Sequence, residues 1–336
     1  MPLPFILGGI AIAAAAAGAK KGYDAYQKNT EANELQERAE NILDKAKGEI
    51  ESARKSAQNA LEDLGKAKLR VWEHSVRRFI KLFEQLKNVD MQAVNMETSL
   101  TFDKAFFDEL KRCEMEVASM FAGGIGGIGA GALTAFGAYG ATMAFASAST
   151  GTAIASLSGV AATNATLAWL GGGSLAAGGL GVAGGAAVLG GLVAGPAIAI
   201  LGFTLDAASN KKLDEARANL AQARKMAEEL KAATEMTHFL RHKIETFENL
   251  LIRLDMTYNT LLDSLEDTLQ ASGEDYKTYS KDAKMVVAAN IKITETIKAV
   301  LDTSIINKKG TITKECENLL ANKQTMLEDA AQLLHS

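Results

Sequence analysis

Between Glu116 and Asp206 the chain contains no Asp, Glu, Lys, Arg or His. This charge-free segment is roughly ninety residues long, whereas about 18 consecutive apolar residues are enough to indicate one membrane-spanning helix. A soluble protein of 336 residues has no core able to hide such a stretch unless the stretch also carries polar faces. Its polar residues are mostly Ser and Thr, whose hydroxyls can bond to their own helix backbone in lipid. The segment therefore predicts a place in a lipid membrane.

Two clusters of small and polar residues, 147–152 and 171–174, predict turns within the segment. They leave apolar blocks at about 117–146, 153–170 and 175–205, each near or above the length of one crossing. The third block has a possible further break at Gly195-Pro196, because proline removes a backbone donor.

Basic residues flank the segment and bear on its topology. Lys111 and Arg112 precede it, and Lys211 and Lys212 follow it. Because Lys and Arg concentrate on the cytoplasmic side, this pattern places both ends there and requires two or four crossings. Trp169 is the residue that we expect at a membrane interface.

Glycines recur at four-residue spacing in the apolar blocks, so they share helix faces. In lipid the hydrophobic effect does not draw helices together, and close packing through small residues replaces it. The candidate packing residues are Gly123, Gly127, Gly131, Gly181, Gly185, Gly191 and Gly195. Ala and Gly insert only marginally alone, which favours a homo-oligomer or insertion from a shielded soluble state. The alternative is a Gly/Ala-rich hairpin buried inside a soluble bundle.

The N-terminal residues 1–18 form an apolar run of about signal-peptide length. A secretory signal has its basic residues before the apolar run, whereas Lys20 and Lys21 follow this one. We therefore expect a retained apolar helix, with a cleaved signal as the alternative.

The regions on either side of the charge-free segment are charged and amphipathic. The whole chain contains only three prolines, and this scarcity favours long helices because proline breaks helix interiors. No window shows the alternation of apolar and polar residues that is typical of a strand. In residues 19–116 an apolar stripe of coiled-coil type recurs at three- and four-residue steps, followed by bulkier residues that include Trp72. The stripe comprises Leu35, Ala39, Ile42, Ala46, Ile50, Ala53, Ala57, Ala60, Leu64, Ala67 and Val71.

Residues 206–336 repeat this pattern. One long helix is expected over about 210–270, then a turn at 272–275, a helix to about Asn307, a break at 308–310 and a last helix ending near Leu334. The apolar residues of the long helix are Leu213, Ala216, Leu220, Ala223, Ala227, Leu230, Phe239, Ile244, Phe247, Leu251 and Leu254. The fold predicted is all-α, with elongated bundle or coiled-coil arms flanking a Gly/Ala-rich transmembrane hairpin region.

Several classes of activity find no support in the sequence. A net charge of −4 gives no attraction to nucleic acid, and the glycine-rich stretch lacks the Gly-Lys-Ser/Thr of a phosphate-binding loop. His238 and His242 lie one helical turn apart but without a third ligand, so a metal site is not expected. Cys113 and Cys316 are interpreted as ordinary thiols. We expect no enzyme activity and no cofactor.

The order of amphipathic helices, a long apolar centre and further helices resembles the α-helical pore-forming toxins of the cytolysin A type. That resemblance implies bundle helices around an apolar element that stays packed away until it meets a membrane. The run over residues 170–191 is similar to the Gly/Ala membrane modules of small interferon-inducible mitochondrial proteins and of bacterial glycine-zipper proteins. This local likeness implies membrane residence.

Three functional hypotheses follow. The first is a membrane-inserting, self-associating protein that perforates or remodels a bilayer. Its two charged arms would form an antiparallel bundle outside the membrane, on the cytoplasmic side. Alternatively, the whole protein stays soluble until it inserts. The second is a non-perforating membrane scaffold or adaptor whose arms bind a partner protein. The third is a soluble helical protein that encloses a lipid.

Overall fold

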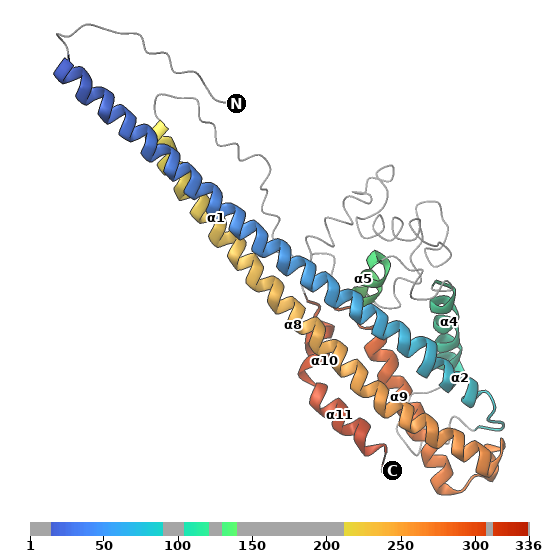
Figure 1. The fold of residues 1–336 in the computed structure, drawn as a ribbon. Helices are drawn as coiled ribbons and strands as arrows, with labels where there is room; N and C mark the ends of the chain where they lie inside the picture. Colours follow the sequence, from blue (N-terminus) through green and yellow to red (C-terminus); the bar gives the residue numbers. More distant parts are fainter. Residues whose placement is uncertain (1–14, 90–103, 121–129, 140–211, 307–311, 335–336) are drawn as a thin grey trace. The chain divides into compact units, whose positions relative to one another are not determined.

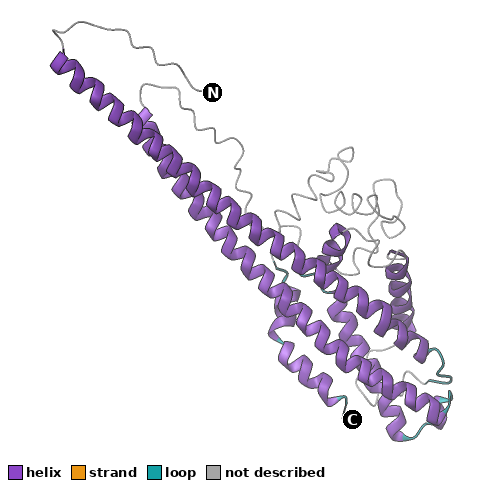
Figure 2. Ribbon diagram, in the orientation of Figure 1, coloured by secondary structure: helices purple, strands orange, loops and turns teal. Residues whose placement is uncertain are grey.

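The computed structural model describes residues 15–89, 104–120, 130–139, 212–306 and 312–334. In these ranges every regular element is a helix, which confirms the all-α prediction for this part of the chain (Figures 1 and 2). The helices are α1 (Ala15–Arg70), the π-helical turn η1 (Val71–Val76), α2 (Arg77–Phe83), α4 (Lys104–Met120), α5 (Ala130–Tyr139), α8 (Lys212–Ser272), the 3-10 turn η6 (Tyr276–Thr278), α9 (Lys281–Asp302), α10 (Lys314–Ala321) and α11 (Lys323–Gln332).

The chain forms two compact units, which are described separately. The first combines Met1–Glu51 with Ile198–Ala233. From here on "the arm" means this unit, which contains only parts of the two arms predicted at 19–116 and 206–336. The second, called the bundle, combines Ser52–Ala197 with Thr234–Ser336. The described part of the arm consists of the N-terminal portions of α1 and α8, and the rest of these two helices belongs to the bundle together with all the other described helices.

In the arm, small apolar residues of α1 and α8 pack in pairs along the two helices. Ala39 and Leu43 form a buried cluster with Leu220 and Ala223. A second cluster contains Ala46, Ile50, Leu230 and Ala233. Alanine seams of this kind let helix backbones approach closely while burying little area per residue, so the arm depends on its length for stability.

The two helices of the arm run parallel, not antiparallel. Residue numbers rise together along the pair, from the ion pair of Glu31 with Arg217 at 3.0 Å to the cluster of Ile50 with Ala233. The prediction that the two charged regions, 19–116 and 206–336, form an antiparallel bundle is therefore wrong for their longest helices, α1 and α8. Consecutive helices joined by a short loop become antiparallel neighbours, whereas parallel helices need a long connection, which the residues between α2 and α8 supply.

The bundle has one continuous hydrophobic core to which α1, α2, α4, α5, α8, α9, α10 and α11 all contribute. An aromatic group joins three of these helices: the rings of Phe79 and Phe83 in α2 lie 5.4 Å apart, and those of Phe83 and Phe107 in α4 lie 5.0 Å apart. Tyr258 in α8 lies 6.3 Å from Phe79. Burying several aromatic side chains supplies more hydrophobic stabilisation than the alanine seam of the arm. Trp72 is also buried, as the sequence predicted.

Caps and turns set the ends of the helices. α8 ends at Ser272, and Gly273 has a φ of +73°, a left-handed conformation that glycine adopts without strain. The hydroxyls of Ser280 and Thr313 accept backbone N–H bonds and begin α9 and α10. The predicted turn at 272–275 is confirmed. α9 ends at Asp302 rather than Asn307, and the last helical region is divided at Asn322 into α10 and α11.

The predicted apolar stripes are largely confirmed. In α1 and at the first residue of η1 the stripe from Ala39 to Val71 is buried, except for partly buried Ile42, and Leu35 is also partly buried. In α8 the prediction is wrong at Phe239, which is 50% exposed, while its neighbour Leu240 is buried. Phe239 lies one position off the seam, and the ammonium of Lys243 lies 5.2 Å from its ring centre.

Candidate functional site

Helix α5 is the one described helix that lies wholly within the charge-free segment. Its sequence, AGALTAFGAY, contains no charged residue, and the side chains of Leu133, Thr134, Phe136 and Ala138 are buried in the bundle. Phe136 is 0% exposed. α4 also runs past Glu116 into this segment, where Val117 is buried. These parts of the segment lie in the hydrophobic core of a helical bundle.

A glycine on each helix allows α5 to cross α1 with backbones in contact. A Cβ atom added to Gly65 in α1 would lie less than 3.0 Å from the carbonyl oxygen of Leu133. A Cβ atom added to Gly137 in α5 would lie equally close to the carbonyl oxygen of Leu61. Real Cβ atoms do not approach backbone atoms this closely, so the crossing requires glycine at both positions.

The C-terminal end of α5 is held by the chain that leaves α9. The backbone N–H of Ile305 donates to the carbonyl oxygen of Ala138 at 2.7 Å. Ile305 is held from its other side by the N–H of Thr313, which donates to the Ile305 carbonyl oxygen at 3.0 Å. We call residues 302–306 the exit segment. It satisfies one of the carbonyl groups that a helix C-terminus leaves without a partner inside the helix.

Lys68 lies under this exit segment. Its side chain is fully buried, and its ammonium donates to the carbonyl oxygen of Thr303 at 3.1 Å. The same nitrogen lies 5.5 Å from the ring centre of Phe247. Burial lowers the pKa of Lys68 to about 7, against the smaller opposing influence of Asp302.

A second lysine joins α9 to α4. The ammonium of Lys298 lies 2.5 Å from Asp302 and 3.0 Å from Glu109, and its side chain is 10% exposed. Burial lowers the pKa of Lys298, whereas the two carboxylates raise it, and together they leave this pKa above its ordinary value. α4 is also tied to the bundle by ion pairs of Arg77 with Glu114 at 2.5 Å and of Lys111 with Glu84.

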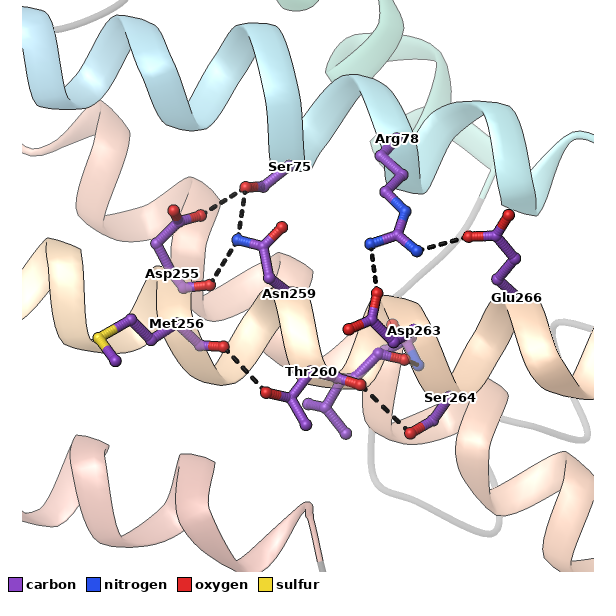
Figure 3. Close-up of polar contacts among 11 residues, drawn as sticks. Ser75, Arg78, Asp255, Met256, Asn259, Thr260, Asp263, Ser264 and Glu266 are labelled. Atoms are coloured by element: carbon purple, nitrogen blue, oxygen red, sulfur yellow. Dashed lines mark hydrogen bonds and ion pairs between the residues drawn. The ribbon is translucent and has the colours of Figure 1, made fainter.

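A polar seam joins η1 and α2 to α8 (Figure 3). The hydroxyl of Ser75 donates to Asp255 at 2.6 Å and accepts from the amide of Asn259 at 3.0 Å. Arg78 bridges Asp263 at 2.7 Å and Glu266 at 2.5 Å. The seam begins within the π-helical turn η1; single π-helical turns inside α-helices are frequent at functional sites. The seam fixes how α8 lies against η1 and α2.

Replacing Asp255 by asparagine should stabilise the bundle at neutral pH by less than about 1 kcal/mol. Burial raises the pKa of Asp255, although the hydrogen bond from Ser75 opposes this. An acid with a raised folded-state pKa costs stability as pH rises through that pKa, because its charged form is disfavoured in the fold. Asparagine keeps an acceptor for Ser75 without the charge. Urea unfolding should therefore give similar midpoints at pH 3.5 and a higher midpoint for Asp255→Asn at pH 7; a constant difference would contradict this explanation.

The predicted site residues are distributed as follows. Lys20 and Lys21 lie in α1, Gly131 lies in α5 and Lys212 is the first residue of α8. Lys111 pairs with Glu84, and Arg112 pairs with Glu116 at 3.3 Å. The remaining candidates lie outside the described residues: Gly123, Gly127, Gly181, Gly185, Gly191, Gly195, Trp169 and Lys211.

Other predictions concern the histidines, the cysteines and the membrane crossings. His238 and His242 lie on α8, and no group of three metal-binding side chains occurs in the described ranges. Cys113 and Cys316 are buried free thiols, and burial raises the pKa of each to about 11, as expected of unreactive cysteines. None of the helices that the structure describes is long and apolar enough to span a membrane. The predicted blocks 153–170 and 175–205, and most of the helix at 1–18, lie outside those ranges.

Gly65, Gly137 and Lys68 were not identified from the sequence. Gly65 is an isolated glycine in an otherwise uninterrupted helical stripe, which is a signal of a packing requirement. Lys68 follows Leu64, a residue of the predicted apolar stripe, by four residues. Helical spacing alone therefore places Lys68 on the apolar face of the helix.

Comparison of the chain with protein-family models, with curated proteins and with solved structures gives no match.

Proposed function

We propose that this protein is a membrane-inserting, self-associating helical protein that perforates or remodels a lipid bilayer. In this proposal the bundle holds part of the charge-free segment before insertion. Release of α5 then makes that segment available to lipid and to copies of itself.

The observation that carries the proposal is the way in which α5 is held. Its contacts with the bundle include buried apolar side chains, a backbone crossing through Gly65 and Gly137, and the hydrogen bond from Ile305. Apolar side chains lose little when a lipid environment replaces a protein core, and small residues pack helices closely in both. A helix held in this way can exchange one set of neighbours for the other.

The neighbouring helix α4 provides a contrast that supports the same proposal. Its charged residues form ion pairs with other parts of the bundle, including Arg77 with Glu114 and Lys298 with Glu109. Moving such charges into hydrocarbon costs several kcal/mol, on the order of 2.5–3.5 for each residue at a helix centre. α4 is therefore suited to remain with the bundle, while the uncharged α5 is suited to leave it.

The proposal is tested with protein purified without detergent. Liposomes containing a self-quenched dye are mixed with the full chain, and the sample is then floated and washed with carbonate. We expect the protein to float with the liposomes and to release the dye. Stable insertion without leakage would replace this function by that of a membrane scaffold. Protein that stays in solution at lipid excess would overturn the membrane reading and favour a permanently buried hairpin.

A further inference from the structure

We propose that Lys68 sets how easily the bundle releases α5, because its amino group is buried beside the segment that holds this helix and has no carboxylate partner among the described residues. This inference rests on the proposed function for its consequence in membranes. Its consequence for the stability of the bundle is independent of any membrane.

The surroundings of Lys68 offer little compensation for a buried charge. Among the residues that the structure describes, its ammonium has one hydrogen bond, to Thr303, and no carboxylate oxygen lies within the 4.0 Å of an ion pair. The ring of Phe247 supplies a cation–π contact at 5.5 Å. An ammonium removed from water and left without a charged partner is costly, whereas its hydration outside the protein is strong.

The ionisable groups around Lys68 do not remove this cost. Asp302 of α9 is nearest in effect, but its carboxylate already binds Lys298 at 2.5 Å. Cys316 of α10 stays a neutral thiol at neutral pH, because burial raises its pKa to about 11. α8 presents the Phe247 ring, and the charge of Lys243 that acts on Cys316 has the same sign as Lys68.

The position of Lys68 connects its burial to the docking of α5. Lys68 follows Gly65, the crossing point on α1, by less than one helical turn. Its acceptor Thr303 and the donor Ile305 belong to the same short exit segment. When α5 leaves, Ile305 loses its contact with Ala138, and the segment that covers Lys68 is free to move. Water then reaches the amino group, so the gain in hydration favours the released state.

The sign of the pH dependence follows from the lowered pKa of Lys68, about 7 in the fold against an ordinary value of 10.5. A lysine with a lowered folded-state pKa binds its proton more weakly in the fold than in the unfolded chain. The bundle therefore gains stability as pH rises from about 7 to 10.5, and the full cost is present below pH 7. Lys68 weakens the docked state at neutral pH and is not a switch operated by mild acid.

The test compares wild type with Lys68→Met and with the control Lys66→Met. Methionine replaces the four-atom apolar stem of lysine and removes the charged amino group, and Lys66 is a partly exposed lysine of the same helix, paired with Glu62 at 3.0 Å. At pH 7 we expect Lys68→Met to raise Tm by at least about 5 °C, and Lys66→Met to change it by less than about 3 °C. The Tm difference between Lys68→Met and wild type should shrink as pH is raised to 9.5. Dye release at pH 7 should be slower for Lys68→Met by about tenfold or more.

Each readout has a result that overturns part of the inference. If the Tm difference between Lys68→Met and wild type is the same at pH 7 and at pH 9.5, the buried charge of Lys68 does not destabilise the bundle. This conclusion holds even if methionine packs imperfectly, because poor packing would shift the Tm of the variant equally at both pH values. A stabilised Lys68→Met that releases dye at the wild-type rate would overturn its control of α5. If wild type releases no dye, the proposed function fails, while the Tm comparison still decides whether Lys68 weakens the bundle.

Discussion

Replacing Gly65 by alanine will displace α5 from the bundle and destabilise it by about 2–3 kcal/mol, near the upper end of the usual cost of overpacking. The added methyl group would collide with the backbone carbonyl of Leu133, not with a flexible side chain. No rotamer change relieves such a contact, so α1 and α5 must move apart. Urea unfolding followed by circular dichroism measures the loss.

Gly48→Ala is the matched control, because it makes the same change in the same helix. Nothing lies within 4 Å of a Cβ atom added there. Alanine should stabilise a helix interior relative to glycine by about 0.5–1 kcal/mol. The two substitutions must therefore have opposite signs. If Gly65→Ala also stabilises the protein, the close crossing of α1 and α5 does not exist.

The partner glycine gives a second check on the crossing. Gly137→Ala alone should cost about as much as Gly65→Ala, since its Cβ atom would meet the backbone of Leu61. The double variant should cost clearly less than the sum, because the first methyl group already separates the helices. Additive costs would indicate two independent sites. Since Gly65→Ala leaves the charge-free segment unchanged, faster dye release by this variant can be attributed to undocking.

Removing the ring of Phe136 will destabilise the bundle by about 3–5 kcal/mol, the usual cost of truncating a buried aromatic side chain to alanine. Phe136 is 0% exposed and is the largest buried side chain among the residues of α5 whose burial the structure describes. Its loss removes apolar contacts and leaves a cavity where α5 meets the core. Thermal unfolding of Phe136→Ala against wild type measures the effect.

Phe239→Ala is the control for this change, since it deletes the same atoms from a side chain that is 50% exposed. Its loss should cost no more than about 1 kcal/mol, mainly from the cation–π contact with Lys243. Equal losses for the two variants would contradict the docking of α5 through Phe136.

Local spacing in the sequence was sufficient to predict much of this fold. Three- and four-residue steps identified the buried stripe from Ala39 to Val71, in α1 and the start of η1, and most of the stripe of α8. The error at Phe239 has the same origin: in a helix of more than sixty residues a seam drifts relative to a fixed pattern, and hydrophobicity alone does not separate Phe239 from Leu240. The turn at Gly273 was recognisable because few residues adopt a positive φ.

Features that depend on partners far apart in the chain were not predictable in the same way. The relative direction of α1 and α8 depends on the long connection between them, whose length permits either direction. The sequence shows Gly65 as an isolated glycine in its helix, but it does not show that Gly137 is its partner in the crossing. Lys68 lies on the apolar face by spacing, yet its acceptor, Thr303, is 235 residues away.

The central claim, that the charge-free segment enters the bilayer while the bundle core stays outside, is tested most directly by tryptophan quenching with brominated lipids. The chain has two tryptophans, Trp169 within the charge-free segment and Trp72 in the bundle core. Trp72→Phe leaves Trp169 as the probe, and Trp169→Phe leaves Trp72. We predict that brominated liposomes quench Trp169 and leave the emission of Trp72 unchanged. Unquenched Trp169 at lipid excess would contradict insertion of the segment, and equal quenching of both would contradict a bundle that remains outside.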